Sequence, residues 1–156
     1  MLDPYGVHLK WEVLAKAGAL GTVDLMLNFP IMDMNMNALL NRPEKLSARE
    51  SARMTAFWGD DSWRKITYRP SSQGDLFGEQ AVEKLPSDAI VEAFCRRLRE
   101  VAGFRCTSRP VAMRNSRNAV VYYLIFSSAK AVACKIVGEI FSQYRVQSPG
   151  ASGPKT

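Results

Sequence analysis

The chain has 156 residues with 21 basic and 15 acidic side chains, which gives a formal net charge of +6. Its composition, 47% hydrophobic and 23% charged, is that of a globular protein of one domain. No apolar run approaches the roughly 18 residues of a membrane span, and the N-terminus lacks the pattern of a signal peptide. We therefore expect a cytoplasmic protein without a membrane partner.

The first predicted element is the end of a strand that runs into a turn, Asp3-Pro4-Tyr5-Gly6. A carboxylate and a neighbouring carbonyl can accept both hydrogens of an exocyclic amino group while an aromatic ring stacks on the base. That arrangement is used when a flipped nucleobase is methylated on nitrogen. Asp-Pro is also common in ordinary turns. We treat Asp3, Pro4 and Tyr5 as candidate catalytic residues of a substrate-binding turn.

A helix is predicted over residues 8–17, ending at Gly18 or Gly21. The nearly continuous apolar run 23–30 is typical of a buried parallel strand. Strand, helix and strand in this order predict a right-handed βαβ unit. The helix residues expected to face the core are Leu9, Val13, Leu14 and Ala17.

Parallel strands end at the same edge of a sheet, so segment 28–30 should lie beside the Asp3 turn and form a pocket wall with it. In segment 32–37 methionines alternate with polar residues. This segment is either an adaptable substrate lining or a first helical turn that buries its methionines. With residues from two later segments, the substrate-lining candidates are Gly6, Asn28, Phe29, Pro30, Asp33, Asn35, Trp58, Trp63, Arg114 and Asn115.

Ser47 and Glu50 form a capping box, which predicts the start of a helix. The aromatic segment 57–63, which contains Trp58 and Trp63, is either a small core of its own or a lid over the substrate. Segment 69–86 has the composition of a loop. An amphipathic helix then starts at the Pro86-Ser87-Asp88 signal, and its apolar face should hold Ile90, Val91, Phe94, Leu98 and Val101.

Two strands, over 104–113 and 120–127, flank a turn at 114–118 and predict an antiparallel hairpin at the edge of the sheet. A last helix is predicted over 129–144. We expect residues 1–145 to form one α/β domain, a parallel βαβ unit followed by the hairpin and a helix, and 146–156 to be a disordered tail. The last helix should bury Ala133, Ile136, Val137, Ile140, Phe141 and Tyr144.

The three cysteines, Cys95, Cys106 and Cys134, are far apart and form no CxxC pair, which favours reduced thiols over disulfides or a zinc site. His8 is the single histidine, so no Ser–His–Asp site or metal centre is indicated. Neither a P-loop nor a GxGxxG motif is present, and Gly18-Ala19-Leu20-Gly21 does not follow a strand.

The positive charge is concentrated in residues 95–117, which carry seven arginines and one glutamate. Arginine suits contacts with phosphates or carboxylates. Alternatively, Arg96, Arg97 and Arg99 are the solvated face of a helix. The cluster comprises Arg96, Arg97, Arg99, Arg105, Arg109, Arg114 and Arg117.

Several blocks of the chain together resemble the three-Cys-motif partner protein family, TcmP, over nearly all of residues 2–145. The resemblance implies a Rossmann-like, class I methyltransferase-type fold of unsettled activity, and a phage-related partner protein of radical-SAM-like type that carries three cysteines. It would make the Asp3 turn follow the fourth strand and segment 28–30 end the fifth. The blocks are 2–6, 24–30, 32–35, 57–63 and 114–124.

Such folds place three strands and a glycine-rich S-adenosylmethionine loop before the fourth strand, and these 156 residues contain none of them. The resemblance therefore implies an N-terminally truncated, methyltransferase-like portion that binds no cofactor and is inactive as an isolated chain. The alternative is a non-enzymatic module that binds nucleic acid or protein through the Arg96–Arg117 cluster. A third hypothesis is a methyltransferase that completes its cofactor site with a partner chain.

Overall fold

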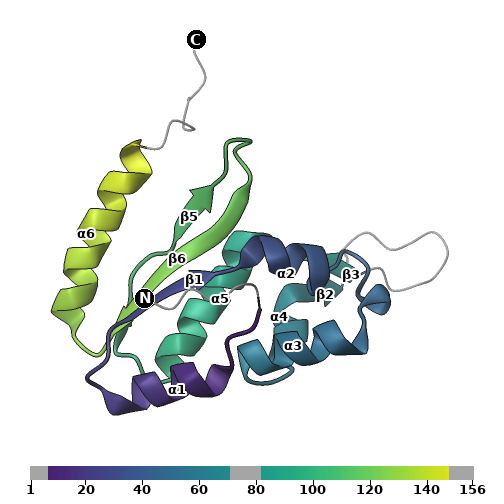
Figure 1. Ribbon diagram of the computed structural model, residues 1–156, viewed down its shortest axis with the longest axis horizontal. Helices are drawn as coiled ribbons and strands as arrows, with labels where there is room; N and C mark the ends of the chain where they lie inside the picture. The colour runs from purple at the N-terminus through teal and green to yellow at the C-terminus, as the bar shows by residue number, and fades with distance from the viewer. Residues whose placement is uncertain (1–6, 71–81, 148–156) are drawn as a thin grey trace, which may run out of the picture.

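The computed structural model describes residues 7–70 and 82–147 of the chain (Figure 1). Its elements are α1 (Trp11–Leu20), β1 (Leu25–Phe29), α2 (Ile31–Asn37), the short 3-10 helix η1 (Pro43–Lys45), α3 (Ala48–Trp58), α4 (Ser62–Thr67), β2 (Tyr68–Pro70), β3 (Val82–Lys84), α5 (Ser87–Glu100), β4 (Cys106–Thr107), β5 (Val111–Arg114), β6 (Val120–Ser128) and α6 (Ala131–Gln147). The Asp3-Pro4-Tyr5-Gly6 turn and most of the predicted tail lie outside the described residues.

The main sheet is antiparallel and is built around β6. On one side β6 pairs with β1, with Phe29 opposite Tyr123. On the other side it pairs with β5 and then β4, with Val111 opposite Leu124 and Cys106 opposite Ser128. All pairs among the described strands are antiparallel. The predicted antiparallel hairpin at the edge of the sheet is confirmed, because β5 pairs with β6 and has no described strand beyond it. The predicted parallel partner of β1 ends at the Asp3 turn, outside the described residues, so that pair stays a prediction. The architecture is mixed α/β with antiparallel sheets, the second being the pair β2–β3.

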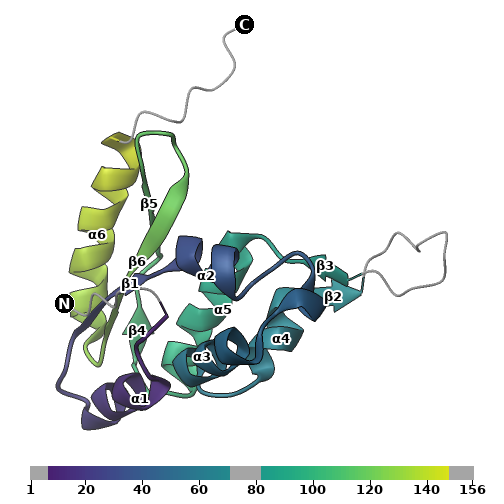
Figure 2. The same cartoon turned by 45° about the vertical axis from the view of Figure 1, so that its right-hand side comes forward.

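Helices cover both faces of the main sheet. In Figure 2, α6 lies alone on one face, and α1, α3, α4 and α5 lie on the other. Strand alternation explains the two sides of β1, because Leu25, Leu27 and Phe29 are buried in the larger core whereas Met26 packs with Phe126 and Phe141 under α6.

The larger core is organised around Phe94 of α5, which is fully buried. Its ring centroid lies 4.9 Å from that of Phe29, 5.2 Å from those of Phe57 and Trp58, and 5.9 Å from that of Trp11. The aromatic residues of segment 57–63 thus belong to the main core rather than to a separate cluster or a lid.

The capping box is confirmed, because the Glu50 backbone N–H donates to Ser47 Oγ at the start of α3. The predicted face of α5 is confirmed at every position except Val101, which is 55% exposed. On α1, Trp11 and Leu14 are buried, whereas Val13 is exposed, so the prediction that Val13 faces the core is wrong. The helix starts three residues later than predicted, and Gly21 ends it.

The last helix buries a narrower face than predicted. Ala133, Val137 and Phe141 pack on the sheet side, but Ile136 and Ile140 are 54% and 46% exposed. Tyr144 and Val132 are also exposed. The physical reason is that α6 contacts one face of a narrow sheet, with no second described helix beside it. None of the described helices is long and apolar enough to cross a membrane.

The prediction of three reduced thiols is wrong for two of them. Cys106 of β4 and Cys134 of α6 form a disulfide across 28 positions of sequence, and Cys95 is a free, buried thiol. Burial raises the pKa of the Cys95 thiol to about 12. The sequence spacing of the cysteines gave no sign of this disulfide, because its two cysteines lie on a strand and a helix that come together only in the folded chain.

Two predicted segments are divided differently. The strand predicted over 104–113 is broken into β4 and β5 at Pro110, which cannot donate a ladder hydrogen bond. The predicted loop 69–86 contains most of β2 and all of β3, and residues 71–81 within it lie outside the described residues. The turn at 114–118 is confirmed, with Asn118 in the left-handed region at φ 61°.

Gly18 should not tolerate alanine. A Cβ at this position would lie 2.0 Å from the backbone oxygen of Ala102, so α1 and the end of α5 would have to separate. We expect Gly18→Ala to lower the free energy of unfolding by about 3 kcal/mol in urea titrations. Gly138→Ala is the matched control: nothing lies within 4 Å of its Cβ, so it should stabilise α6 by about 0.5–1 kcal/mol. Equal losses in both variants would contradict the close approach.

Candidate functional site

Five of the ten predicted substrate-lining residues lie at the carboxyl end of β1 or in α2, which follows it: Asn28, Phe29, Pro30, Asp33 and Asn35. Phe29 is buried in the core and Pro30 is the buried N-cap of α2, so neither offers a surface to a ligand. Asn28 is half-buried and lies on the same face of β1 as Met26. Of segment 28–30, only Asn28 can therefore contribute a side chain to a pocket wall.

Asp33 connects this end of β1 with the start of the described chain. Its Oδ2 accepts a 3.0 Å hydrogen bond from the buried Val7 backbone N–H. Its Oδ1 accepts from Asn37 Nδ2 at 2.7 Å. The chain that leaves the Asp3-Pro4-Tyr5-Gly6 turn is thus held against α2, although the turn itself lies outside the described residues.

Arg53 of α3 joins the same group. Its NH1 donates to Glu50 Oε2 at 2.7 Å, and its NH2 lies 3.7 Å from Asp33 Oδ2 and 3.3 Å from His8 Nε2. The buried Nε of Arg53 has no partner among the described residues. Sequence reasoning missed this arginine, since nothing in a helix opened by a capping box singles out one basic residue.

A second polar group joins α2 to β3 and α5. Lys84 Nζ donates to Asn35 Oδ1 at 2.7 Å and also to the Leu39 carbonyl, and Asn35 Nδ2 donates to Ser87 Oγ at 3.2 Å. Desolvation lowers the pKa of the Lys84 ammonium. Asn35, a predicted substrate-lining residue, therefore has both ends of its amide occupied by protein groups.

Tyr123 and Asp88 lie at the same end of the sheet. The Tyr123 hydroxyl, on the strand beside Phe29, donates to Asp88 Oδ1 near the start of α5. Burial first, and this hydrogen bond next, raise the pKa of Tyr123 well above its usual value. The hydroxyl thus stays protonated and serves as a donor. Sequence reasoning noted Asp88 only as part of a helix-start signal, and it named neither Lys84 nor Tyr123 as a candidate site residue.

The remaining predicted lining residues divide into two places. Trp58 and Trp63 are fully buried, and their indole N–H groups donate to Ser62 Oγ and Thr55 Oγ1 at 3.0 Å each. Because both indole rings are buried in the core, neither can line a substrate-binding surface. Arg114 and Asn115 are exposed in the hairpin turn, where Arg114 NH1 donates to the Asn118 carbonyl. That turn follows the same end of the sheet as Asn28, as the register of β1, β5 and β6 requires.

The arginine cluster is not one surface. Arg114 pairs with Val120 and Cys106 with Ser128, so Arg105 and Arg114 lie at opposite ends of β6, about 27 Å apart along the strand. Figure 1 shows the hairpin turn at the end of the sheet away from the end of α5. The cluster therefore forms at least two separate basic groups.

Arg97 has a structural role within this cluster. Its Nε donates to the Trp58 carbonyl at 2.7 Å, its NH2 donates to Asp60 Oδ2 at 2.5 Å, and its guanidinium carbon lies 4.7 Å from the centroid of the Trp11 ring. Only 13% of the side chain is exposed. The hypothesis that Arg97 belongs to a solvated helix face is therefore wrong, while Arg96 and Arg99 are exposed.

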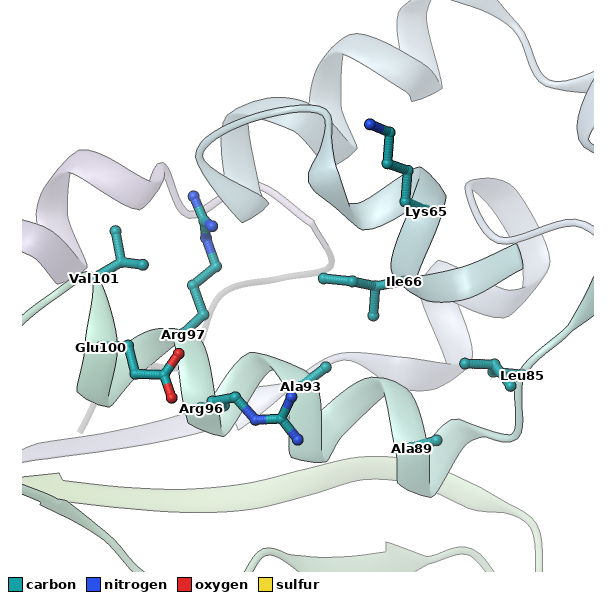
Figure 3. A pocket seen from close by; sticks show the side chains of 9 residues that line it. All are labelled: Lys65, Ile66, Leu85, Ala89, Ala93, Arg96, Arg97, Glu100 and Val101. Carbon is teal, nitrogen blue, oxygen red and sulfur yellow. The ribbon is translucent and has the colours of Figure 1, made fainter. Parts of the chain in front are cut away.

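A groove of about 550 Å³ lies between α4 and α5 (Figure 3). Ile66 and Ala93 are among its apolar lining residues, and its charged lining residues are Lys65, Arg96, Arg97 and Glu100. The sheet lies on the other side of α5, so this groove is separate from the carboxyl end of β1. With three basic side chains and one acidic side chain, the groove carries a modest excess of positive charge.

Comparisons with models of known families, with curated proteins and with solved structures gave no significant match to the chain. Among the described residues, no group of three His, Cys, Asp or Glu side chains could hold a metal ion. The candidate site is therefore the set of polar groups around Asp33 and Asn35.

Removing the Asp33 carboxylate should release the segment next to the N-terminal turn. Asp33→Ala leaves the buried Val7 N–H without its acceptor, which should cost about 1–3 kcal/mol of unfolding free energy. Amide hydrogen exchange at Val7 should accelerate by tenfold or more. Asn37→Ala, which loses an exposed hydrogen bond to the same carboxylate, should change stability by less than about 0.5 kcal/mol. Unchanged Val7 exchange in Asp33→Ala would contradict this role.

Asp60 should make a pH-dependent contribution to stability. Hydrogen bonds from Ser62, and then Arg97, lower the pKa of the Asp60 carboxyl from its ordinary 3.8. Because the folded-state pKa is the lower one, the stabilisation is complete above the unfolded-state pKa and disappears as the pH falls through the folded-state value. The stability difference between wild type and Asp60→Asn should be constant from about pH 5 to 7 and shrink below about pH 4. A difference that grows on acidification would show the opposite shift.

Proposed function

We propose that the chain forms the substrate-side portion of a class I methyltransferase-type domain of the TcmP kind, with the carboxyl end of β1 as its substrate-binding end. The observation that carries the proposal is the hydrogen bond from Val7 N–H to Asp33. This hydrogen bond makes the segment that follows the Asp3 turn a neighbour of α2, the helix that follows β1. A carboxylate, a carbonyl and an aromatic ring would then face a planar amino-bearing substrate from one side.

The strand arrangement supports the same proposal. Two strands that are both antiparallel to a third run in the same direction as each other, as the strands of a mostly parallel sheet do. Here β6 lies between β1 and β5 and is antiparallel to both. Helices on both faces of the sheet are also expected of such a domain. The register would make β1 the fifth strand, as the resemblance implies.

S-adenosylmethionine would supply the methyl group to a domain of this class, but the described residues do not fit it. Gly18 packs against the Ala102 carbonyl and Gly21 ends α1, so neither forms a phosphate- or cofactor-binding loop. After β1 the chain enters α2 through Pro30 without a glycine. We therefore assign no methyl transfer to this chain alone, and its role is to bind and orient the substrate.

Calorimetry with S-adenosylmethionine tests the proposal. The 156-residue chain should give no binding heat. The same chain extended by the in-frame translation of the preceding DNA should contain a glycine-rich strand–loop–helix and bind the cofactor at micromolar concentration. Binding to the 156-residue chain, or an upstream sequence that lacks such a unit, would contradict the proposal.

A second candidate is a non-enzymatic nucleic-acid-binding module, favoured by the exposed arginines at the hairpin turn and on α5. Because the two groups lie at opposite ends of the sheet, paired variants separate them. If the hairpin turn binds, Arg114→Ala/Arg117→Ala should weaken binding of a single-stranded oligonucleotide and reduce its salt dependence, whereas Arg96→Ala/Arg99→Ala should not. No change in either pair would exclude a role for both groups.

A further inference from the structure

The outer face of α6 carries an apolar stripe that the fold leaves uncovered. Val132, Ile136 and Ile140 recur every four residues and are 63%, 54% and 46% exposed. Residues four apart lie on one face of a helix, so the three side chains are continuous. With the adjoining exposed part of the helix they form an apolar surface on the order of a few hundred Å², beyond what isolated residues give.

The fold presents this stripe on a fixed helix. Phe141 packs under α6 against the sheet, and the disulfide between Cys106 and Cys134 ties the N-terminal half of the helix to β4. In Figures 1 and 2, α6 lies at the outside of the molecule with no other described helix next to it. A partner would therefore meet a preformed surface and pay little ordering entropy.

The charges beside the stripe indicate which partner fits. Lys135 and Glu139 are both exposed, lie one turn apart, and border the stripe on the side away from the sheet. If two copies of α6 pack antiparallel about a twofold axis, Lys135 of each copy faces Glu139 of the other. In a parallel arrangement this charged flank would instead meet the opposite flank of the other helix, so Lys135 and Glu139 would not face each other. The pattern is thus self-complementary only in the antiparallel, isologous arrangement.

We propose that two copies of the chain associate through α6, antiparallel, with the stripe of Val132, Ile136 and Ile140 at the centre of the interface. A stable interface buries about 800 Å² per partner, more than one helix stripe supplies. The dimer is therefore weak, with a dissociation constant on the order of 10–100 μM.

Sedimentation velocity over about 5 to 500 μM of the oxidised chain tests the apolar contact. Wild type should shift from monomer to dimer across this range. Ile136→Lys should weaken dimerisation by at least tenfold, while Leu20→Lys should leave it unchanged, because Leu20 is a 66% exposed residue of α1 on the other face of the sheet. A monomeric wild type at every concentration, or equal behaviour of the two variants, would overturn the proposal.

Mixing two charge variants tests the orientation. Lys135→Glu places Glu against Glu139 of the second copy, and Glu139→Lys places Lys against Lys135, so each variant alone should be monomeric. An equimolar mixture should recover the dimer, because each contact is then between opposite charges. The like-charged pair within each helix remains in the mixture, so recovery can come only from contacts between copies. A mixture that stays monomeric while wild type dimerises would overturn the antiparallel arrangement.

Discussion

Replacing Phe94 with alanine should lower the free energy of unfolding by about 4 kcal/mol, close to the whole stability of a marginal domain. The ring is fully buried and lies within 6 Å of four other aromatic rings, as its centroid distances of 4.9, 5.2, 5.2 and 5.9 Å record. The loss combines the cavity with the aromatic pair contacts. Guanidinium unfolding followed by circular dichroism measures it.

Val101→Ala provides the matched control for Phe94→Ala. Both positions were predicted on the apolar face of α5, but Val101 is 55% exposed. Its truncation should cost less than about 0.5 kcal/mol. If Val101→Ala cost as much as Phe94→Ala, the helix would be rotated relative to the described packing.

Reducing the disulfide between Cys106 and Cys134 should lower the free energy of unfolding by about 3.5 kcal/mol. The bond closes a loop of 28 residues, and loop-closure entropy in the unfolded chain gives a loss of this size. Cys106→Ala, Cys134→Ala and the double variant should each lose about the same amount, because each removes one and the same bond. Oxidised and reduced wild type compared in urea give the reference value.

Thiol counting provides the control for the disulfide. The oxidised, denatured chain should expose one reactive thiol, that of Cys95, and the reduced chain three. A reducing agent should not change the stability of the double variant. Three reactive thiols in the oxidised chain, or additive losses in the single variants, would contradict the bond.

Local sequence signals predicted local structure well. The Ser47 capping box, the face of α5 around Phe94 and the turn at 114–118 were all correct, because each depends on residues within a few positions of one another. The antiparallel pairing of β1 with β6 was not predicted, since an apolar run such as 25–29 is the same whether its neighbour runs parallel or antiparallel.

Contacts between distant segments escaped prediction for a physical reason. Asn35 meets Lys84 and Ser87 across 49 and 52 positions, and Cys106 meets Cys134 only because β4 lies under the start of α6. The indoles of Trp58 and Trp63 suit a lid and a core equally well until the packing around Phe94 is known. The strand β1 and its end before Pro30 were predictable, but which side chains at that end remain accessible was not.

Nuclear Overhauser contacts between residues 1–3 and β1 test the central claim most directly. If the chain is the substrate-side portion of a methyltransferase-type sheet, residues 1–3 form a strand parallel to 26–28, and the Asp3 turn lies beside Asn28. Backbone amides of 2–3 should then show the staggered contacts of a parallel pair with 26–28, and Asp33→Ala should weaken them. An antiparallel pattern, or no contact with β1 while the Val7 amide stays protected, would contradict the account.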